Sequence, residues 1–198
     1  MKLYGAADSI ALAPHIALVE SGMAYDFDLV DHHAHVCEDG GSYFDINPSG
    51  YVPAMRLDDG SILTESIAVI WYIAESASDR MLIGGDARYR TLQWLCFAST
   101  ELHQRFMRFA QPGLSEELAN ATKDQLRERF SHASKALDET GWLVGDALSV
   151  ADIFLYVCSR WLQYIDIDAN QWPQIASLRT AMETRPSVRR ALAEQGIG

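Results

Sequence analysis

The stretch Gly50-Tyr-Val-Pro53, together with the later stretch Leu63-Thr-Glu-Ser66, is the most informative part of the sequence. Because Val52 precedes a proline, steric contact pushes its backbone toward an extended conformation. The Val52–Pro53 bond can be cis at modest energetic cost, and a cis bond would turn a backbone edge outward. The first stretch therefore predicts an exposed, extended backbone edge.

A hairpin connects the two stretches and leads into a helix. Residues 53–57 read as a short strand, Asp58-Asp-Gly60 as a turn and residues 61–63 as a second strand. Glu65-Ser66 then opens an apolar helix that runs through Ala77. Free N–H groups at such a helix start favour a carboxylate or phosphate. An extended edge beside this helix start suits a small peptide with a free carboxylate.

The residues before these stretches predict the rest of a small mixed sheet. Residues 2–4 form a short strand, residues 11–21 form a helix that stops at Gly22, and residues 25–29 alternate in polarity as a strand does. Residues 31–50 form a polar connection that carries several histidines. The predicted order is β-α-β followed by β-β-α, with one strand pair parallel through the helix crossover and one hairpin antiparallel.

The pattern changes after residue 77. Residues 78–87 are predicted to be a linker, and helical periodicity continues from there to residue 198. A buried helix stripe consists of Leu92, Leu95, Ser99, Leu102, Phe106 and Phe109. Further helices are predicted at residues 115–139, 150–165, 173–184 and 187–194. The chain thus divides into an α+β domain over residues 1–77 and an all-α domain over residues 88–198.

One helix start in the second domain carries its own capping signal. Ser149 can cap the N–H groups of the helix that follows it, and Asp152 can reach back to the Ser149 N–H. This arrangement is a short-armed form of the capping box. We therefore assign the pair a structural role.

The composition limits the classes of partner. The chain has 198 residues and a formal net charge of −11, which argues against nucleic acid and against an anionic membrane surface. Its apolar content of 48% is typical of a globular protein, and no apolar run approaches the ~20 residues of a membrane span. No signal peptide is evident, and the three widely spaced cysteines form no disulfide framework, so we expect a cytoplasmic protein.

Several runs of sequence together resemble the glutathione transferases, and the bacterial beta class in particular. They are Met1-Lys-Leu-Tyr4, Leu12-Ala-Pro-His-Ile-Ala-Leu18, Asn47-Pro-Ser-Gly-Tyr-Val-Pro53, Glu101-Leu-His103 and Leu148-Ser-Val-Ala-Asp152. The resemblance covers nearly the whole chain. It implies a thioredoxin-like N-terminal domain that binds glutathione, an all-α C-terminal domain, and a homodimer that conjugates glutathione to an electrophilic, apolar small molecule.

The resemblance also implies where glutathione binds. The Val52–Pro53 edge, with its peptide bond cis, would pair with the cysteinyl backbone. Ser66 would donate a hydrogen bond to the γ-glutamyl carboxylate, and Glu65 would accept one from the ammonium group. His35 stands where the class usually has a lysine that contacts the glycyl carboxylate, and a histidine does this better when protonated. The alternative for Glu65 and Ser66 is an ordinary helix start, which suits both residue types.

The sequence departs from the beta class at the start of the first helix. The class carries a cysteine where this chain has Ile10, so we expect no mixed disulfide with glutathione there. Ser9 is the nearest hydroxyl, and we expect it to stabilise the glutathione thiolate. Lowering a thiol pKa of ~8.5 by about 2 units needs roughly 2.7 kcal/mol, and a hydrogen bond to a charged group supplies about 1.5–3 kcal/mol. The alternatives are that Ser9 only caps the helix, or that Tyr4 acts instead, although Tyr4 is more typical of a core residue.

His103 is the second candidate catalytic residue, because the matching histidine of the family lies by the active site. The alternative is a partly buried helix histidine without a catalytic role. The class usually has a lysine where this chain has Gln104, and an asparagine where it has Cys96. Arg105 and Arg108 are placed to restore positive charge.

Histidines in the connection after the second predicted strand raise the question of a metal site. His32, His33, His35 and Cys37 are residue types that bind zinc. Their spacing matches no standard site, so we expect no metal cofactor.

Two other functions stay open at the level of the sequence. One is a glutathione-binding protein with little catalysis, which the loss of the class cysteine and lysines favours. The other is a glutathione-dependent isomerase or ether-cleaving enzyme. The second substrate has no sequence motif: the aromatic residues that could line its pocket are more often core, and they are Phe106, Phe109, Trp161 and Tyr164.

Overall fold

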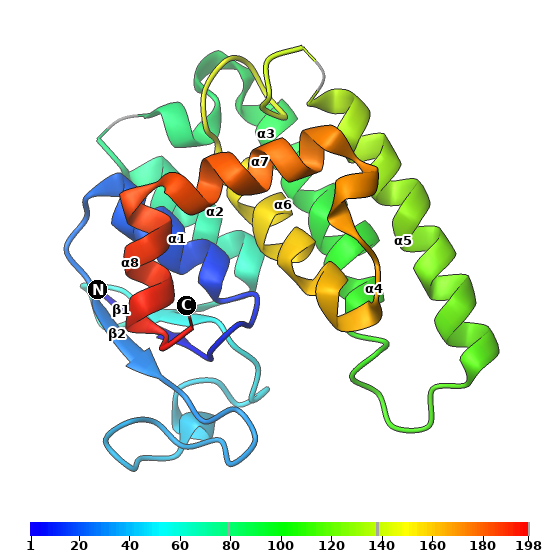
Figure 1. The fold of residues 1–198 in the computed structure, drawn as a ribbon. Helices are drawn as coiled ribbons and strands as arrows, with labels where there is room; N and C mark the ends of the chain where they lie inside the picture. Colours follow the sequence, from blue (N-terminus) through cyan, green and yellow to red (C-terminus); the bar gives the residue numbers. More distant parts are fainter. Residues whose placement is uncertain (79, 138, 198) are drawn as a thin grey trace. The chain divides into compact units, whose positions relative to one another are not determined.

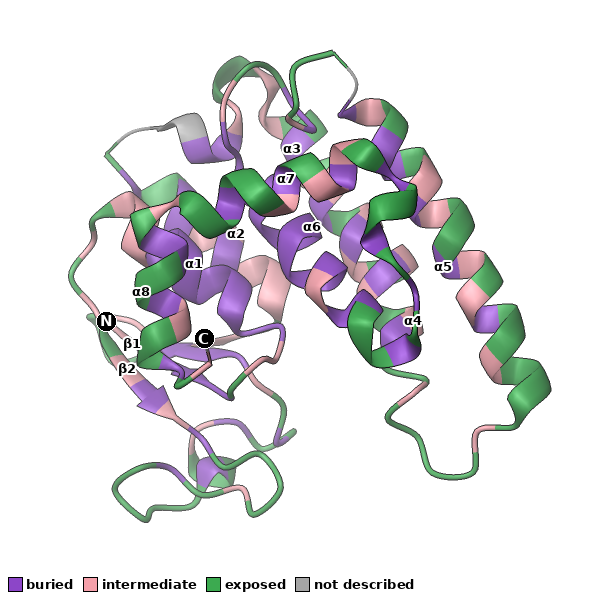
Figure 2. Ribbon diagram, in the orientation of Figure 1, coloured by how far each residue is buried: buried purple, intermediate pink, exposed green. Residues whose placement is uncertain are grey.

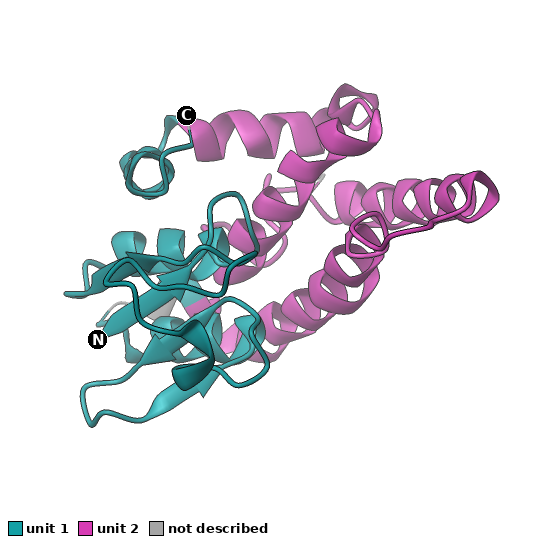
Figure 3. Ribbon diagram, turned by 90° about the horizontal axis from the view of Figure 1, so that it is seen from below, with its two compact units in different colours: residues 1–82, 184–198 teal, residues 83–183 magenta. Residues whose placement is uncertain are grey.

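The computed structural model describes residues 1–78, 80–137 and 139–197. The chain divides into two compact units, one made of residues 1–82 and 184–198 and the other of residues 83–183 (Figure 3). The domains predicted from the sequence follow chain order, whereas packing joins residues 184–198 to the first unit.

The first unit is built on a four-stranded sheet with the strand order β2-β1-β3-β4. Its strands are β1 (Lys2–Gly5), β2 (Asp26–Leu29), β3 (Ala54–Arg56) and β4 (Ile62–Thr64). β1 pairs with β2 in parallel, while β3 is antiparallel to both β1 and β4. The predicted mixed sheet, with one parallel pair and one hairpin, is therefore confirmed.

Three helices belong to the first unit: α1 (Leu12–Ser21), α2 (Ser66–Ser76) and α8 (Pro186–Glu194). α1 packs against both α2 and α8 (Figure 1). α1 ends where Gly22 adopts a left-handed conformation, with φ of 67°, as the sequence predicts. Residues 12–18 of α1 are buried, and its last three residues are half-buried (Figure 2).

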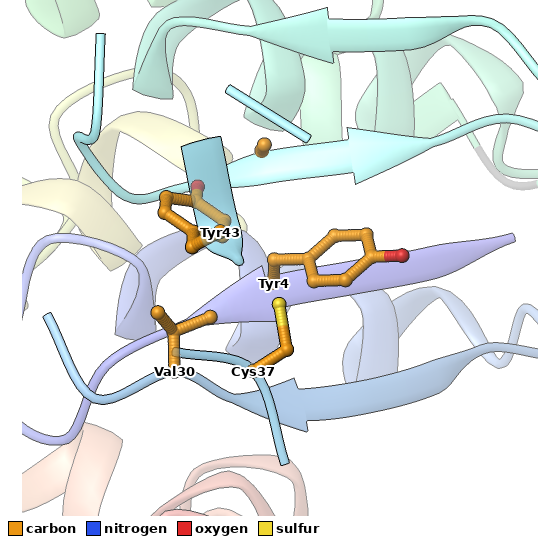
Figure 4. Packing of buried hydrophobic residues seen from close by; sticks show 5 residues of the cluster. Tyr4, Val30, Cys37 and Tyr43 are labelled. Atoms are coloured by element: carbon orange, nitrogen blue, oxygen red, sulfur yellow. The ribbon is translucent and has the colours of Figure 1, made fainter. Parts of the chain in front are cut away.

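The predicted polar connection between β2 and β3 folds back onto the sheet. It contains the 3₁₀ turn Tyr43–Asp45, and Tyr43 is fully buried. Tyr43 and Cys37 join Tyr4, Val30 and Ala54 in one hydrophobic cluster (Figure 4). Tyr4 is therefore a core residue, as predicted from the sequence. Burial raises the pKa of the Cys37 thiol.

The second unit is helical. One helical run comprises α3 (Arg88–Phe97), the π-helical segment Ala98–His103 and α4 (Gln104–Phe106). It is followed by α5 (Glu116–Ala136), α6 (Val150–Arg160) and α7 (Pro173–Thr184), with short 3₁₀ turns at Trp161–Ile165 and Ala169–Gln171. The predicted linker contains the 3₁₀ turns Arg80–Ile83 and Gly85–Ala87. No described helix has the length and apolar character needed to cross a bilayer.

α6 forms the centre of the second unit, since all of its residues but Arg160 are buried (Figure 2). The predicted capping box begins it. The buried Asp152 carboxylate accepts hydrogen bonds from the Ser149 N–H at 2.8 Å, the Ser149 hydroxyl at 2.7 Å and the Leu143 N–H at 2.7 Å. Burial raises the pKa of Asp152 to about 6. Every contact of this carboxylate is local, which supports a structural role.

Candidate glutathione site

The sheet topology brings four segments of the first unit to one end of the sheet. Tyr4 pairs with Ala54, Gly5 with Leu29, and Ala54 with Thr64. Because β3 runs opposite to the other strands, it begins where β1, β2 and β4 end. We call this the loop end of the sheet, since the chain leaves or enters every strand there.

The Val52–Pro53 segment enters β3 at the loop end. Its peptide bond is cis, as predicted. The register of β3 with β4 places the residues before Ala54 alongside those that follow Thr64. Among the described residues, the N–H and C=O of Val52 have no hydrogen-bond partner. This unpaired backbone lies at a bend in the chain, and the register of β3 with β4 places it near Glu65.

The Tyr51 carbonyl, which precedes Val52, is held by two side chains of the β2–β3 connection. The Tyr43 hydroxyl donates to the Tyr51 carbonyl at 2.9 Å, and Asn47 Nδ2 donates to the same oxygen at 2.7 Å. Tyr43 is 0% exposed and Asn47 is 5% exposed. Sequence reasoning did not assign either residue a role. Asn47 carries a signal in the Asn-Pro-Ser-Gly run, whereas the only signal for Tyr43 is its aromatic ring within a polar connection.

α2 begins at the loop end with an unusual backbone conformation. Glu65 has φ of 68° and ψ of 121°, values that few non-glycine residues adopt, and its side chain is exposed and does not cap the helix. The first N–H groups of α2 have no intrahelical acceptor, as at every helix start. These donors, together with the Ser66 hydroxyl, form a place where a carboxylate can bind.

His35 lies against the turn that leads into Val52. Its ring packs on Phe44 with centroids 4.4 Å apart. A Cβ atom at Gly50 would lie 2.9 Å from His35 Cε1, so only glycine allows this approach. The Nδ1 atom of His35 is buried without a hydrogen-bond partner among the described residues. The structure thus brings His35 close to the predicted backbone edge.

Ser9 lies in the turn between β1 and α1, also at the loop end. Its hydroxyl donates to the Ala6 carbonyl at 2.7 Å and accepts from the Ala11 N–H at 3.2 Å. The neighbouring Ile10 side chain is only 5% exposed. In this state Ser9 stabilises the turn, and its proton already has an acceptor.

Backbone strain gathers at the same end of the sheet. The described non-glycine residues with positive φ are Asp8, His35, Glu65 and Asp166. The first three lie in segments that leave β1, β2 and β4. Such conformations cost roughly 1–3 kcal/mol each and persist where the surroundings enforce them, often at ligand sites.

His103 lies in the second unit, on the π-helical segment. Its ring contacts Trp161, with centroids 5.6 Å apart, and Phe154, at 6.4 Å. Burial lowers the pKa of His103 to about 4, so the ring is neutral at pH 7. Arg105 does not provide a free charge nearby, because it pairs with Glu101 at 2.9 Å and donates to the Thr100 carbonyl at 3.0 Å.

The histidines of the β2–β3 connection do not converge with Cys37. The rings of His32 and His33 lie 4.0 Å apart at the surface, whereas Cys37 packs against the sheet. Within the described part of the chain, no group of three or more His, Cys, Asp or Glu side chains could hold a metal ion.

Comparison with known proteins agrees with this fold. The family description "Glutathione S-transferase, N-terminal domain" matches residues 9–76, and "Glutathione S-transferase, C-terminal domain" matches residues 92–186. Glutathione S-transferase GstA of Escherichia coli O157:H7 is 35% identical over 200 residues, which cover 100% of both chains.

Solved structures give the same result. A sphingomonad glutathione S-transferase complexed with glutathione has a TM-score of 0.94 and 35% identity, and covers 100% of both chains. The bacterial beta class enzyme of Sphingomonas chungbukensis has a TM-score of 0.93 and 36% identity, also over 100% of both chains. The chain therefore belongs to the glutathione S-transferase family. The predicted fold, a thioredoxin-like domain followed by a helical domain, is confirmed.

Proposed function

We propose that the chain is a glutathione transferase whose glutathione site is the loop end of the sheet in the first unit. The observation that carries this proposal is the convergence there of an unpaired backbone edge at Val52, the open helix start at Ser66, and the side chains of His35 and Glu65. A tripeptide with two carboxylates and one ammonium group has partners for each of its parts at this end.

Each part of glutathione is assigned to one partner. The Val52 N–H and C=O pair with the cysteinyl backbone as an added strand would. The γ-glutamyl carboxylate accepts from the first N–H groups of α2 and from Ser66, and its ammonium group donates to Glu65. Pro53 holds the edge extended, and His35 contacts the glycyl carboxylate. These assignments rest on the geometry of the free protein together with the family.

The chemistry requires a thiolate. The thiol proton leaves to solvent, a sulfur lone pair forms the carbon–sulfur bond, and the leaving group departs with the bonding electrons. Ser9 would stabilise the thiolate by exchanging the Ala6 carbonyl for sulfur as its acceptor, a favourable exchange because hydrogen bonds to charged groups are stronger. The catalytic role of His103 rests on the family resemblance alone.

A second function is glutathione binding with little catalysis. The hydrogen bonds that occupy Ser9 and the apolar side chain at position 10 favour it. The test is calorimetric binding of glutathione, followed by mass-spectrometric detection of a conjugate with a model aryl halide. Binding with conjugation supports the transferase. Binding without conjugation supports the second function, and failure to bind contradicts both.

We also propose that the protein is a cytoplasmic homodimer of beta-class type, in which Ile10 replaces the class cysteine. The support is the family, whose members include a described beta class enzyme with the same fold. Light scattering at micromolar concentration tests the dimer, since a monomeric mass contradicts it.

A further inference from the structure

A pair of buried donors holds the Tyr51 carbonyl at the entrance to β3. The Tyr43 hydroxyl and the Asn47 amide both donate to this one oxygen, at 2.9 Å and 2.7 Å. We call the two side chains the carbonyl fork. Nothing in the proposed function uses them, because neither is exposed enough to touch a ligand.

Both side chains of the carbonyl fork are themselves held in place. The Tyr43 ring lies in the hydrophobic cluster, 6.2 Å from the ring of Tyr4 (Figure 4). Asn47 Oδ1 accepts from the Ser49 N–H at 3.1 Å, and the Asn47 carbonyl accepts from the Gly50 N–H at 2.8 Å. Burial raises the pKa of Tyr43, so its hydroxyl remains a donor at any physiological pH.

Holding this carbonyl also sets the direction of the next N–H. A peptide group is planar, so the Tyr51 carbonyl and the Val52 N–H share one rigid unit and point in opposite directions. With the oxygen held by two donors, the Val52 N–H has one orientation. That N–H has no partner among the described residues. Two donors on the oxygen also polarise the peptide and strengthen the N–H as a donor.

We propose that Tyr43 and Asn47 are positioning residues for glutathione, which orient the Val52 backbone so that it can pair with the cysteinyl part of the peptide. This inference rests on the proposed function. Tyr43 and Asn47 act through Val52 and touch neither glutathione nor the reacting atoms. The conformational entropy of the Val52 backbone is then lost when the protein folds. Binding of glutathione therefore does not carry this entropic cost.

The test uses the full-length protein and two peptides. One peptide is glutathione, and the other is an analogue in which a trans-alkene replaces the cysteinyl–glycine amide, so that it has no cysteinyl carbonyl to accept from the Val52 N–H. The variants are Tyr43→Phe, which removes one donor of the fork, and Asn47→Asp, which keeps an acceptor for the Ser49 N–H but loses the amide donor when ionised. Tyr4→Phe is the matched control, because it removes a hydroxyl from the same buried cluster without touching Tyr51.

We expect Tyr43→Phe to bind glutathione about 3- to 10-fold more weakly, which corresponds to the loss of one hydrogen bond. The alkene replacement should weaken binding to the wild type strongly and to Tyr43→Phe less, because the Val52 N–H of this variant has already lost its orientation. KM for glutathione should rise while kcat at saturating glutathione stays unchanged. Tyr4→Phe should match the wild type in all three measurements.

Different results separate the failure of this inference from that of the proposed function. If the wild type does not bind glutathione, the proposed function fails. If the wild type binds but Tyr43→Phe behaves like Tyr4→Phe, or loses both peptides in equal proportion, the fork is only structural and the inference is overturned. Thermal unfolding checks that each variant folds. If Tyr43→Phe does not fold, Asn47→Asp is compared with the wild type in its place.

Discussion

The buried ring of His15 on α1 lies 2.7 Å from the Glu194 carboxylate on α8, measured from Nε2 to Oε2. The same carboxylate accepts from the Tyr25 hydroxyl at 2.7 Å and from Arg190 at 2.7 Å. Gln195 reaches Nδ1 of His15 at 3.1 Å, so both ring nitrogens have partners. The histidine of the Leu-Ala-Pro-His run thus joins two helices that are far apart in the sequence.

We expect Glu194→Gln to lower the free energy of unfolding by about 1–3 kcal/mol at pH 7, because the charged hydrogen bonds to three partners are weakened. Burial opposes ionisation of Glu194, but the hydrogen bonds from Arg190, Tyr25 and His15 outweigh it and lower the pKa to about 2. A carboxylate with a lowered pKa stabilises the fold above its ordinary pKa of ~4.3, and this contribution is lost as the pH falls toward 2.

Urea unfolding of the wild type and Glu194→Gln at a series of pH values provides the measurement. The difference between the two should shrink below about pH 4. Glu38→Gln, which changes an exposed residue in the β2–β3 connection, is the control and should change little. A constant difference down to pH 2 would show that the carboxylate is not held in its ionised form.

We expect Ser66→Ala to weaken glutathione binding by about 1–2 kcal/mol, since one hydrogen bond to a carboxylate is lost at the start of α2. Isothermal calorimetry measures the change. Ser61→Ala is a suitable control, because Ser61 lies in the neighbouring hairpin turn and its hydroxyl donates to Asp59 at 2.6 Å. Equal affinity of Ser66→Ala and Ser61→Ala would place the γ-glutamyl carboxylate elsewhere.

We expect Ser9→Ala to raise the pKa of the bound glutathione thiol by about 1–2 units, because the thiolate loses a donor worth roughly 1.5–3 kcal/mol. The ultraviolet absorbance of the thiolate, followed as a function of pH, measures this pKa. Replacing Cys37, Cys96 and Cys158 together should leave it nearly unchanged. If Ser9→Ala leaves the pKa unchanged but activity persists, backbone N–H groups suffice for activation.

We expect the His103 ring to remain neutral throughout the range from pH 6 to pH 8. Burial among aromatic rings lowers its pKa to about 4, below the ordinary value of ~6.5. In the unfolded chain this histidine has its ordinary pKa. As the pH falls below that pKa, the unfolded chain gains a proton that the folded protein does not, so the free energy of unfolding decreases. Nuclear magnetic resonance of the imidazole protons tests this, and a midpoint near pH 6.5 would contradict it.

Local signals explain which parts of the fold the sequence could predict. Three signals act over only a few residues: the position before Pro53, the Asp-Asp-Gly turn and the apolar run after Ser66. The hairpin and α2 follow from them directly. The capping box at Ser149 is equally local. These are the parts of the prediction that the structure confirms in detail.

Long-range contacts explain what the sequence did not reveal. Asp28 occupies a polar position in an alternating strand, yet it is only 2% exposed, because Lys2 on the adjacent strand pairs with it at 2.7 Å. The two donors on the Tyr51 carbonyl depend on how the β2–β3 connection folds over the sheet. Such contacts have no pattern in the order of the residues, since they depend on strand pairing and chain return.

The assignment of α8 to the first unit has a consequence for synthesis on the ribosome. The first unit contains residues 1–82 and 184–198, so the helix that completes the surroundings of His15 is made after the entire second unit. A nascent chain therefore cannot finish the first unit while the helical unit is being translated, and α1 must wait with an uncovered apolar face. Exposed apolar surface of this kind is what chaperones bind, so we expect α1 to be a chaperone-binding segment until residues 184–198 have been made.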